Sequence, residues 1–332
     1  MNAATGSPIV LGIDVGTTSM KGVALDLEGA TVSTASTITQ WDVAESGDVQ
    51  MPIDRLADAA LHVMQELART APTGSSVVGI GIAGLAETGV IVDAHGSPCT
   101  PAIAWYAQRG AEELASLPAD FLAEFSAVTG LAAKAECSFA KLLWLQSKGM
   151  RVPAGAVWLN ALEYIAFRLT GTRASEPSLA SRTGLLDQAA VAPWLGALTR
   201  IGADASFLPD LVSAGTSIGT VVAAAPRALR GAAVTVAGHD HLVNSVGAGA
   251  VGGDDLFDSC GTADVILRTV PRTLSNEERA RLVGRGLSAG RHVLPGSTAI
   301  LGATRSGLVL GRVLSMLGAK SLGARRRIAD PW

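Results

Sequence analysis

Eight consecutive residues near the start of the chain carry groups that could hold a nucleotide phosphate. The segment from Asp14 to Lys21 reads DVGTTSMK and separates two short apolar runs, which predicts the turn of a β-hairpin. Gly16 would let the backbone approach a phosphate closely, and the hydroxyls of Thr17 and Thr18 could donate to its oxygens. Asp14 could hold Mg²⁺ through water, and Lys21 could offset phosphate charge. The alternative is an ordinary polar turn, since the pattern is neither a Walker loop nor a GxGxxG turn.

The segment GHDH at residues 238–241 is a second candidate site. It follows a short apolar run and precedes a stretch with helical spacing, so Asp240 is expected at a strand-to-helix junction. There its carboxylate could accept a proton from a substrate hydroxyl during phosphoryl transfer. The alternative is that Asp240 caps the following helix, which suits the position equally well.

A third candidate site lies at residues 79–88, which read GIGIAGLAET. Small residues at the end of a strand leave room for a ligand, and Glu87 could bond to sugar hydroxyls. Downstream, Trp105 could form a wall of this site and Arg109 a polar clamp. For Trp105 alone, plain core packing is the favoured alternative.

Hydrophobic periodicity predicts an α/β chain with two units. A second apolar hairpin, after residue 231, repeats the apolar strand, Gly-Thr and apolar strand of the first, which would suit a duplicated nucleotide-binding fold with a cleft between its halves. The expected strands are 9–13, 20–27, 30–39, 77–82, 89–92, 234–237, 255–259 and 263–268, and the expected helices are 53–69, 111–117, 140–148, 159–169 and 242–250.

Composition narrows the class of protein. The net charge of −3 and the pI near 6.0 provide no basic footprint for nucleic acid. The three cysteines, Cys99, Cys137 and Cys260, are far apart, so a disulfide framework or zinc site is not expected and a reduced cytoplasmic setting fits. Only 17% of residues are charged and the mean hydropathy is +0.35, which predicts a large core or exposed apolar surface.

Neither a secretory signal nor a membrane span is expected. The first eight residues lack a basic segment followed by an apolar one. The most membrane-like stretch, residues 299–317, is interrupted by Arg305 and Arg312 and is rich in glycine, so it is predicted as strand, turn and helix.

Together these segments resemble the FGGY carbohydrate kinases, a branch of the actin-like ATPase superfamily. The resemblance implies an α/β, ribonuclease H-like fold with two domains around a cleft, here expected at 1–232 and 233–332. The matching segments are residues 11–21 for the first phosphate loop, 79–87 for the sugar-contacting strand end, 104–109 for a W-x-D-x-R pattern, 167–171 for F-R-L-T-G, 238–240 for the catalytic-acid turn and 259–263 for the second phosphate loop.

The same resemblance implies ATP-dependent phosphorylation of a hydroxyl on a small sugar, ketose or polyol. It makes Asp240 the general base and places Mg²⁺ near Asp14. The cofactor contacts that it implies are Asp14, Gly16, Thr17, Thr18 and Lys21, with Gly261 and Thr262 reaching the ATP phosphates from the other side of the cleft. The expected substrate contacts are Glu87, Trp105, Arg109 and His241.

The sequence departs from the family pattern in three ways. Ala107 stands where W-x-D-x-R has Asp, so one polar contact is expected to be missing. Ala86 precedes Glu87 where glycerol kinases carry an Arg-Glu pair, which argues against glycerol. Family members run well past 400 residues, and residues 319–332 do not resemble their continuation. The second domain is therefore expected to be incomplete, without its adenine-binding part, in a xylulokinase-like chain.

Two other functions remain as alternatives. The first is a catalytically impaired fragment or sugar-binding pseudokinase. Loss of the adenine side supports it, whereas retention of Asp14 and Asp240 argues against long decay. The second is a nicotinamide-dependent oxidoreductase, which is disfavoured because no GxGxxG joins a strand to a helix. The expected partner is a small carbohydrate or polyol, not nucleic acid or a membrane. The sequence leaves the identity of that substrate open among ketoses, polyols and sugar acids, and it leaves a homodimer open.

Overall fold

A six-stranded mixed sheet forms the centre of the first unit in the computed structural model, which describes residues 7–45, 47–260, 264–304 and 306–319. β1 (Pro8–Val15) pairs with β2 (Ser19–Asp26) in antiparallel fashion, and β2 pairs in the same way with β3 (Thr31–Ile38). β6 (Ser76–Gly84) runs parallel to both β1 and β13 (Ala233–His239). Buried and partly exposed residues alternate along β1, as the two-residue period of a strand requires. In sheet order the strands are β12 (Gly219–Thr220), β13 (Ala233–His239), β6 (Ser76–Gly84), β1 (Pro8–Val15), β2 (Ser19–Asp26) and β3 (Thr31–Ile38).

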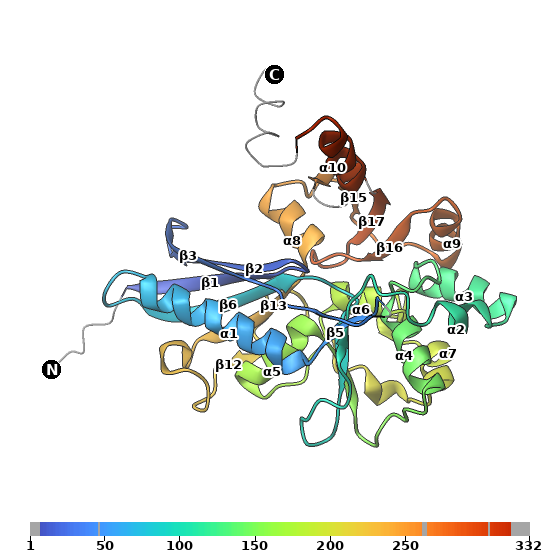
Figure 1. Cartoon of the computed structure of the whole chain (residues 1–332), viewed down its shortest axis with the longest axis horizontal. Coiled ribbons are helices and arrows are strands. Elements are labelled where there is room, and N and C mark those ends of the chain that lie inside the picture. Colours follow the sequence, from blue (N-terminus) through green and yellow to red (C-terminus); the bar gives the residue numbers. More distant parts are fainter. Residues whose placement is uncertain (1–6, 46, 261–263, 305, 320–332) are drawn as a thin grey trace.

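Two helices cover one face of this sheet (Figure 1): α1 (Ile53–Thr70) packs on β2 and β3, and α5 (Ala161–Thr170) packs on β13 and on α1. The apolar residues of α1 recur at three- and four-residue spacing and are buried against the sheet, which is why this segment forms a helix here. They are Ile53, Leu56, Ala57, Ala60, Val63, Met64 and Leu67.

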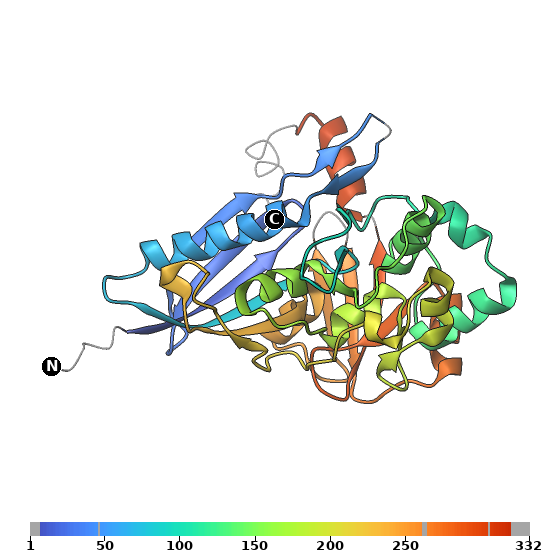
Figure 2. The same cartoon turned by 90° about the horizontal axis from the view of Figure 1, so that it is seen from below.

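A second apolar core lies beside the sheet, among the short helices drawn in green and yellow in Figure 2. Phe121, Phe125, Phe139 and Trp194 form its aromatic centre, with ring centroids 5.3 to 6.3 Å apart. The helices of this region are α2 (Ala111–Ala115), α3 (Ala119–Thr129), α4 (Ser138–Ser147), α6 (Pro177–Thr183), α7 (Leu195–Leu198) and the 3₁₀ turns η1 (Thr199–Ile201) and η2 (Ala205–Phe207); η3 (Arg227–Leu229) lies against α1.

Short strand pairs complete the first unit. The strands β4 (Asp42–Val43), β5 (Val49–Met51) and β8 (Ala102–Ile103) form one small sheet, β7 (Gly89–Val92) pairs with β9 (Val157–Asn160), and β10 (Leu186–Asp187) pairs with β11 (Ala192–Pro193). The predicted helix at 159–169 begins two residues later than expected, because Leu159 and Asn160 pair with β7 as part of β9.

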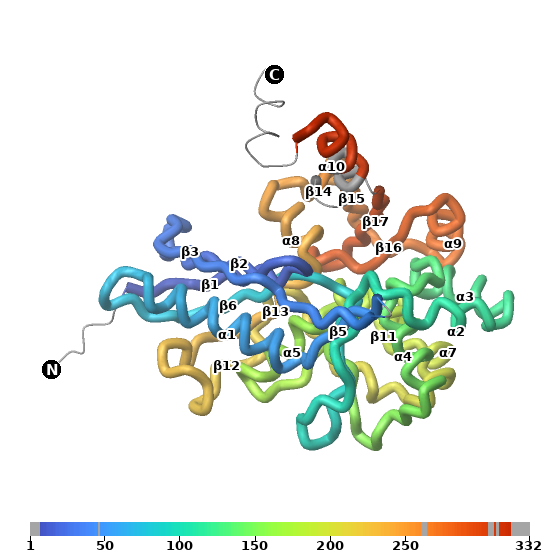
Figure 3. Tube along the Cα trace, viewed as in Figure 1, coloured from blue at the N-terminus to red at the C-terminus, as the bar shows by residue number. Residues whose placement is uncertain are grey.

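The second unit contains a four-stranded antiparallel sheet. Figure 3 shows α8 between the first sheet and the elements of this second one. Its elements, with the strands in sheet order, are β14 (Leu256–Cys260), β15 (Asp264–Val270), β17 (Thr298–Thr304) and β16 (Ser288–Arg291), and the helices are α8 (Asp240–Gly247), α9 (Asn276–Gly284) and α10 (Ser306–Met316). The predicted second hairpin, β14 with β15, is confirmed.

The second unit attaches to the helical region of the first. β16 and α9 contact α6 and α3, where the Arg279 guanidinium donates to the Ala127 carbonyl at 2.7 Å. Several large apolar side chains of the second unit are exposed, including Leu256 and Ile266, so the high hydropathy reflects exposed surface as well as core. Among the described residues, none of the helices has the length and apolar character needed to cross a membrane.

The sheets divide the chain at a different place from the expected boundary of 232/233. Strand β13, which we expected to open the second unit, pairs in parallel with β6 inside the first sheet, with Ala233 opposite Gly79. The physical reason is burial: the pairing with β6 places Val234 and Val236 of β13 in the apolar core of the first unit. The second sheet therefore begins at β14.

Candidate active site

The turn between β1 and β2 is closed by its own backbone. The Gly16 N–H donates to the Ser19 carbonyl at 3.1 Å, and a Cβ on Gly16 would lie 2.7 Å from that carbonyl oxygen. Glycine is therefore required for this tight turn. At its base, Asp14 of β1 lies opposite Lys21 of β2 and beside Ala83 of β6.

Two tryptophans from other segments hold the same turn. The Trp41 indole N–H donates to the Thr17 carbonyl at 2.8 Å, and the Trp105 N–H donates to the Thr17 hydroxyl oxygen at 2.9 Å. Thr39 adds a hydroxyl bond to the Gly16 carbonyl at 2.8 Å. Trp105, predicted as a wall of the substrate site, thus contacts the predicted phosphate loop directly.

The carboxyl ends of three neighbouring parallel strands bring the predicted acids together. β1 ends beyond Asp14, β6 ends at Gly84 just before Glu87, and β13 ends at His239 just before Asp240. Ligands of open α/β sheets bind at this edge. Close packing here again requires glycine, because a Cβ on Gly84 would lie 2.3 Å from the Val15 carbonyl oxygen.

Asp240 is the first residue of α8, and its carboxylate accepts from the His241 N–H at 2.7 Å. The N-cap position is held by His239, so the helix-capping alternative for Asp240 does not describe this junction. Burial raises the pKa of Asp240 to about 7, and the negative charges of Asp14 and Glu87 add to the effect. A carboxyl with that pKa is suited to exchange protons near neutral pH.

Asp14 and His241 share this electrostatic environment. Burial raises the pKa of Asp14 above its ordinary value, although Lys21 and His241 oppose the shift. Burial lowers the pKa of His241, while the carboxylates of Glu87 and Asp14 act in the opposite direction. The structure thus brings together Asp14, Glu87, Asp240 and His241, and the roles assigned to them stay predictions.

Glu87 has an arginine partner that sequence reasoning missed. The Arg182 Nε donates to Glu87 Oε1 at 2.7 Å, and its Nη1 donates to the Ser288 hydroxyl of β16 at 3.1 Å. Glu87 has φ of 63°, a conformation that is uncommon outside glycine, and its carbonyl accepts from the Ser138 hydroxyl at 2.7 Å. No sequence pattern marked Arg182, because the burial of its α6 neighbours from Ser178 to Thr183 is known only from the structure.

Another missed group supports the turn that carries Asp240. The His239 backbone N–H donates to the Ser178 hydroxyl at 3.0 Å, and that hydroxyl donates to Glu176 Oε2. Gly238 packs against both, since a Cβ there would lie 2.7 Å from Ser178 Oγ. Burial raises the pKa of Glu176 to about 7.

The contacts of Arg109 are those of a structural residue. Its guanidinium pairs with Asp48 at 3.0 Å, bonds to Gln50 and lies 4.4 Å over the Trp144 ring. Buried Lys141, which the sequence did not single out, donates to the Trp105 carbonyl at 2.9 Å, and burial lowers its pKa to about 8. Trp105 is therefore fixed from both ends.

Gly261 and Thr262, predicted for the second phosphate loop, lie outside the described residues. The strands on either side of them pair as far as Cys260 and Asp264.

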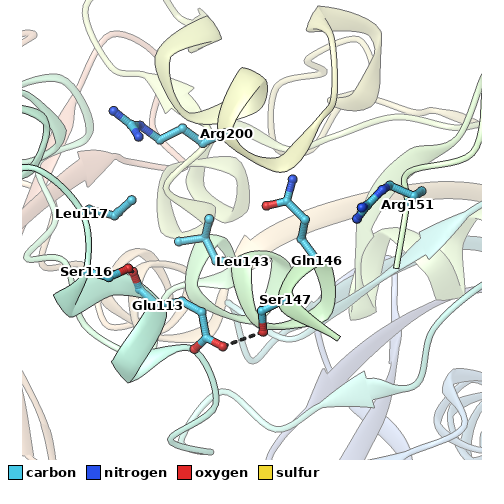
Figure 4. Close-up of a pocket in the computed structure, with 8 residues that line it drawn as sticks. All are labelled: Glu113, Ser116, Leu117, Leu143, Gln146, Ser147, Arg151 and Arg200. Atoms are coloured by element: carbon cyan, nitrogen blue, oxygen red, sulfur yellow. Dashed lines mark hydrogen bonds between the residues drawn. The ribbon is translucent and has the colours of Figure 1, made fainter. Parts of the chain in front are cut away.

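A separate hollow of about 500 Å³ lies on the helical region, away from the predicted site residues. Figure 4 shows Arg151, Arg200 and Gln146 around it and the bond from the Ser147 hydroxyl to Glu113, which measures 2.6 Å. The site at the strand ends is thus defined by convergent side chains and not by this hollow.

Comparison with known proteins matches most of the chain to one family. Residues 9–247 match the model of the N-terminal domain of the FGGY family of carbohydrate kinases. The chain is 29% identical over 273 residues to L-fuculokinase of Salmonella typhi, covering 78% of this chain and 56% of that protein. It is 25% identical over 301 residues to xylulose kinase of Lactococcus lactis, covering 89% and 58%. The chain thus spans little more than half the length of these relatives.

Solved structures agree on the fold. The chain superposes on xylulose kinase from Rhodospirillum rubrum with a TM-score of 0.85 at 24% identity, covering 97% of this chain and 66% of that one. It superposes on Plasmodium falciparum glycerol kinase with ADP with a TM-score of 0.82 at 18% identity, covering 98% and 67%. These matches confirm the expected actin-like ATPase fold. Because residues 9–247, most of this chain, match the family model, the chain belongs to the FGGY family of carbohydrate kinases.

Proposed function

We propose that this chain carries the catalytic groups of an ATP-dependent kinase that phosphorylates a hydroxyl of a small sugar, ketose or polyol. The observation that carries the proposal is Asp240. Its carboxyl, with a pKa of about 7, lies at the carboxyl end of β13 in the electrostatic field of Asp14 and Glu87. The pKa of Asp240 thus suits it to exchange protons, while Asp14 is available to bind the metal ion and Glu87 the substrate.

In this proposal the Asp240 carboxylate takes the proton of the accepting hydroxyl as that oxygen forms its bond to phosphorus. The bond between phosphorus and the ADP oxygen breaks, and ADP leaves with the electron pair. Mg-ATP, when bound, would supply the phosphoryl group, and its magnesium ion would offset the negative charge of the phosphates.

The residues of the first turn fit a nucleotide phosphate with its magnesium ion. Three acids share this edge of the sheet. A divalent cation would stabilise the charged form of Asp14 and so offset the burial that raises its pKa. The Thr17 hydroxyl already accepts from Trp105, so its own hydrogen is available to donate to a phosphate oxygen. We therefore assign Asp14 to magnesium, through water, and assign Gly16, Thr17, Thr18 and Lys21 to the phosphates. Gly261 and Thr262 are proposed for the same phosphates from the second unit.

Substrate hydroxyls are proposed to bind between Glu87, Trp105 and His241. The Glu87–Arg182 pair presents an acceptor and a donor side by side, a combination that suits neighbouring hydroxyls of a sugar. Relatives are named L-fuculokinase and xylulose kinase, which supports a ketose as the substrate. The free thiols of Cys99 and Cys137 agree with a cytoplasmic setting, where ATP is available.

ADP release from Mg-ATP over a panel of pentuloses, deoxyketoses, pentitols and sugar acids tests this function. We expect substrate-dependent release that falls by at least about a thousandfold in Asp240→Asn, since the general base and its charge are both lost. The matched control is Asp254→Asn, at a fully exposed aspartate of the second unit. A folded Asp240→Asn variant with near-normal turnover would exclude Asp240 as the base. Absence of release from every compound would overturn the proposed activity.

A further inference from the structure

The junction of β13 and α8 presents three donor atoms in a geometry that also suits a transition-metal ion. His239 Nε2 lies 3.3 Å and His241 Nε2 lies 3.7 Å from Asp240 Oδ1. One ligand atom from each of the three residues can be chosen so that all lie within 4.8 Å of one another. Zinc bonds to imidazole nitrogen at about 2.0–2.1 Å in tetrahedral geometry, which places two donors roughly 3.3–3.4 Å apart. The observed separations are close to that spacing.

The backbone that presents these donors is fixed before any ion binds. Gly238 has φ of 112° and packs against Ser178 and Val293, and the Ser178 hydroxyl holds the His239 N–H. The two imidazole rings face each other edge-on, with centroids 5.2 Å apart and planes at 81°. Loss of conformational freedom on binding would therefore be small.

Apart from the substrate contact proposed for His241, the described residues give neither ring a hydrogen-bond partner at Nδ1. Nδ1 of His239 and Nδ1 of His241 are both buried, and each lacks a hydrogen-bond partner among the described residues. An ion bonded to the Nε2 atoms would leave these Nδ1 atoms as they are, so the site rests on the geometry of the two Nε2 atoms and the Asp240 carboxylate. A buried histidine and a partly buried one, next to a carboxylate, are typical of a metal-binding group.

The donor set selects the kind of ion. Mg²⁺ prefers six oxygen ligands, so two imidazoles do not suit it. Late first-row divalent ions accept imidazole nitrogen readily. We propose that His239, Asp240 and His241 form a binding site for such an ion, with Zn²⁺ as the leading candidate, distinct from the Mg²⁺ assigned to Asp14. An ion held there would occupy the Asp240 carboxylate and so compete with its proposed role as a base.

Titration of the tag-free, metal-free chain with Co²⁺, without nucleotide or sugar, tests the site. Co²⁺ reports its own coordination, because tetrahedral sites absorb visible light much more strongly than octahedral ones. We expect about one Co²⁺ per chain with a tetrahedral-type spectrum, displaced by Zn²⁺. Affinity should fall by at least about tenfold in His241→Ala and in Asp240→Asn, because each loses a direct ligand.

The matched control is His62→Ala, which removes an exposed histidine of α1 and should leave the titration unchanged. Circular dichroism establishes that each variant is folded. Binding that is absent in the parent chain, or that survives both site substitutions in folded variants, would overturn the proposal. Since no turnover is measured, this outcome is independent of whether the chain proves to be a kinase.

Discussion

The Arg182 guanidinium donates to the Glu87 carboxylate at 2.7 Å although the two residues are 95 positions apart. The same guanidinium reaches Ser288 on β16, so one side chain joins Glu87 of the first unit to the second sheet. Both side chains are largely buried, with 20% and 10% of their surface exposed. Removal of one partner of this pair is therefore expected to cost more free energy than removal of one partner of an exposed ion pair.

Arg182→Gln is expected to weaken sugar binding. The substitution leaves Glu87 without its charged partner, and a hydrogen bond to a charged group contributes about 1.5–3 kcal/mol, so sugar KM should rise roughly 10- to 100-fold. Steady-state kinetics at saturating Mg-ATP provides the measurement. Arg268→Gln, at an exposed arginine paired with Asp254, is the control and should change KM less than about twofold. Equal KM values for the two variants would refute a substrate role for the Arg182–Glu87 pair.

Gly16→Ala is expected to disrupt the β1–β2 turn that we propose as the first phosphate loop. Its new Cβ would lie 2.7 Å from the Ser19 carbonyl oxygen, so the turn must open, at a cost of about 1–3 kcal/mol in the free energy of unfolding. ATP affinity should fall in parallel. Urea unfolding and ATP titration give the two measurements. Gly284→Ala in α9 places its Cβ in open space and serves as the control. An unaltered ATP affinity in Gly16→Ala would contradict the assignment of this turn to the phosphates.

The sequence predicted the parts of this fold that depend on local pattern. Apolar periodicity located α1 and the β1–β2 hairpin, and the run of acid, glycine and hydroxyl residues marked the turn because its chemistry is contiguous. The division into two sheets was not predictable in this way. Whether β13 pairs with β6 or with β14 depends on contacts between strands far apart in sequence, and no local pattern records that choice.

The same limit applies to the site. Asp14, Glu87 and Asp240 each lie in a recognisable segment, whereas Arg182 and Ser178 act through bonds to residues 95 and 61 positions away. A lone arginine or serine in a short helix has no pattern that distinguishes it from a surface residue. Arg109 is the opposite case. The sequence predicted it as a polar clamp on the substrate, but in the structure its guanidinium is already bonded to Asp48.

The contribution of Glu176 to stability is expected to fall as pH rises from about 5 to 7.5. Burial raises the pKa of Glu176 to about 7 from its ordinary 4.5, so the folded state holds this proton more tightly than the unfolded state does. Such a group favours the folded chain at low pH, and that advantage is lost between the unfolded and folded pKa values. Glu163, whose pKa is also raised to about 7 by burial, acts in the same direction.

Thermal unfolding across this range, for the parent chain and Glu176→Gln, measures the effect. The variant cannot ionise at this position, so its Tm should decline less steeply; each such group changes the free energy of unfolding by at most about 1.4 kcal/mol per pH unit. Glu277→Gln, at an exposed residue of α9, should follow the parent curve. Parallel curves for the parent and Glu176→Gln would show that Glu176 does not carry the proton.

The central claim is that Asp240, with its pKa near 7, is the base for the accepting hydroxyl, and the pH dependence of kcat/KM tests it most directly. Burial raises the pKa of Asp240, so the carboxylate form needed for catalysis is lost below pH 7. We predict that kcat/KM for the best sugar rises about tenfold per pH unit below 7 and levels above it, since one proton must leave. In Asp240→Glu the residual activity should show a shifted limb. A flat profile through pH 7, with the chain folded throughout, would contradict the assignment of Asp240 as the base.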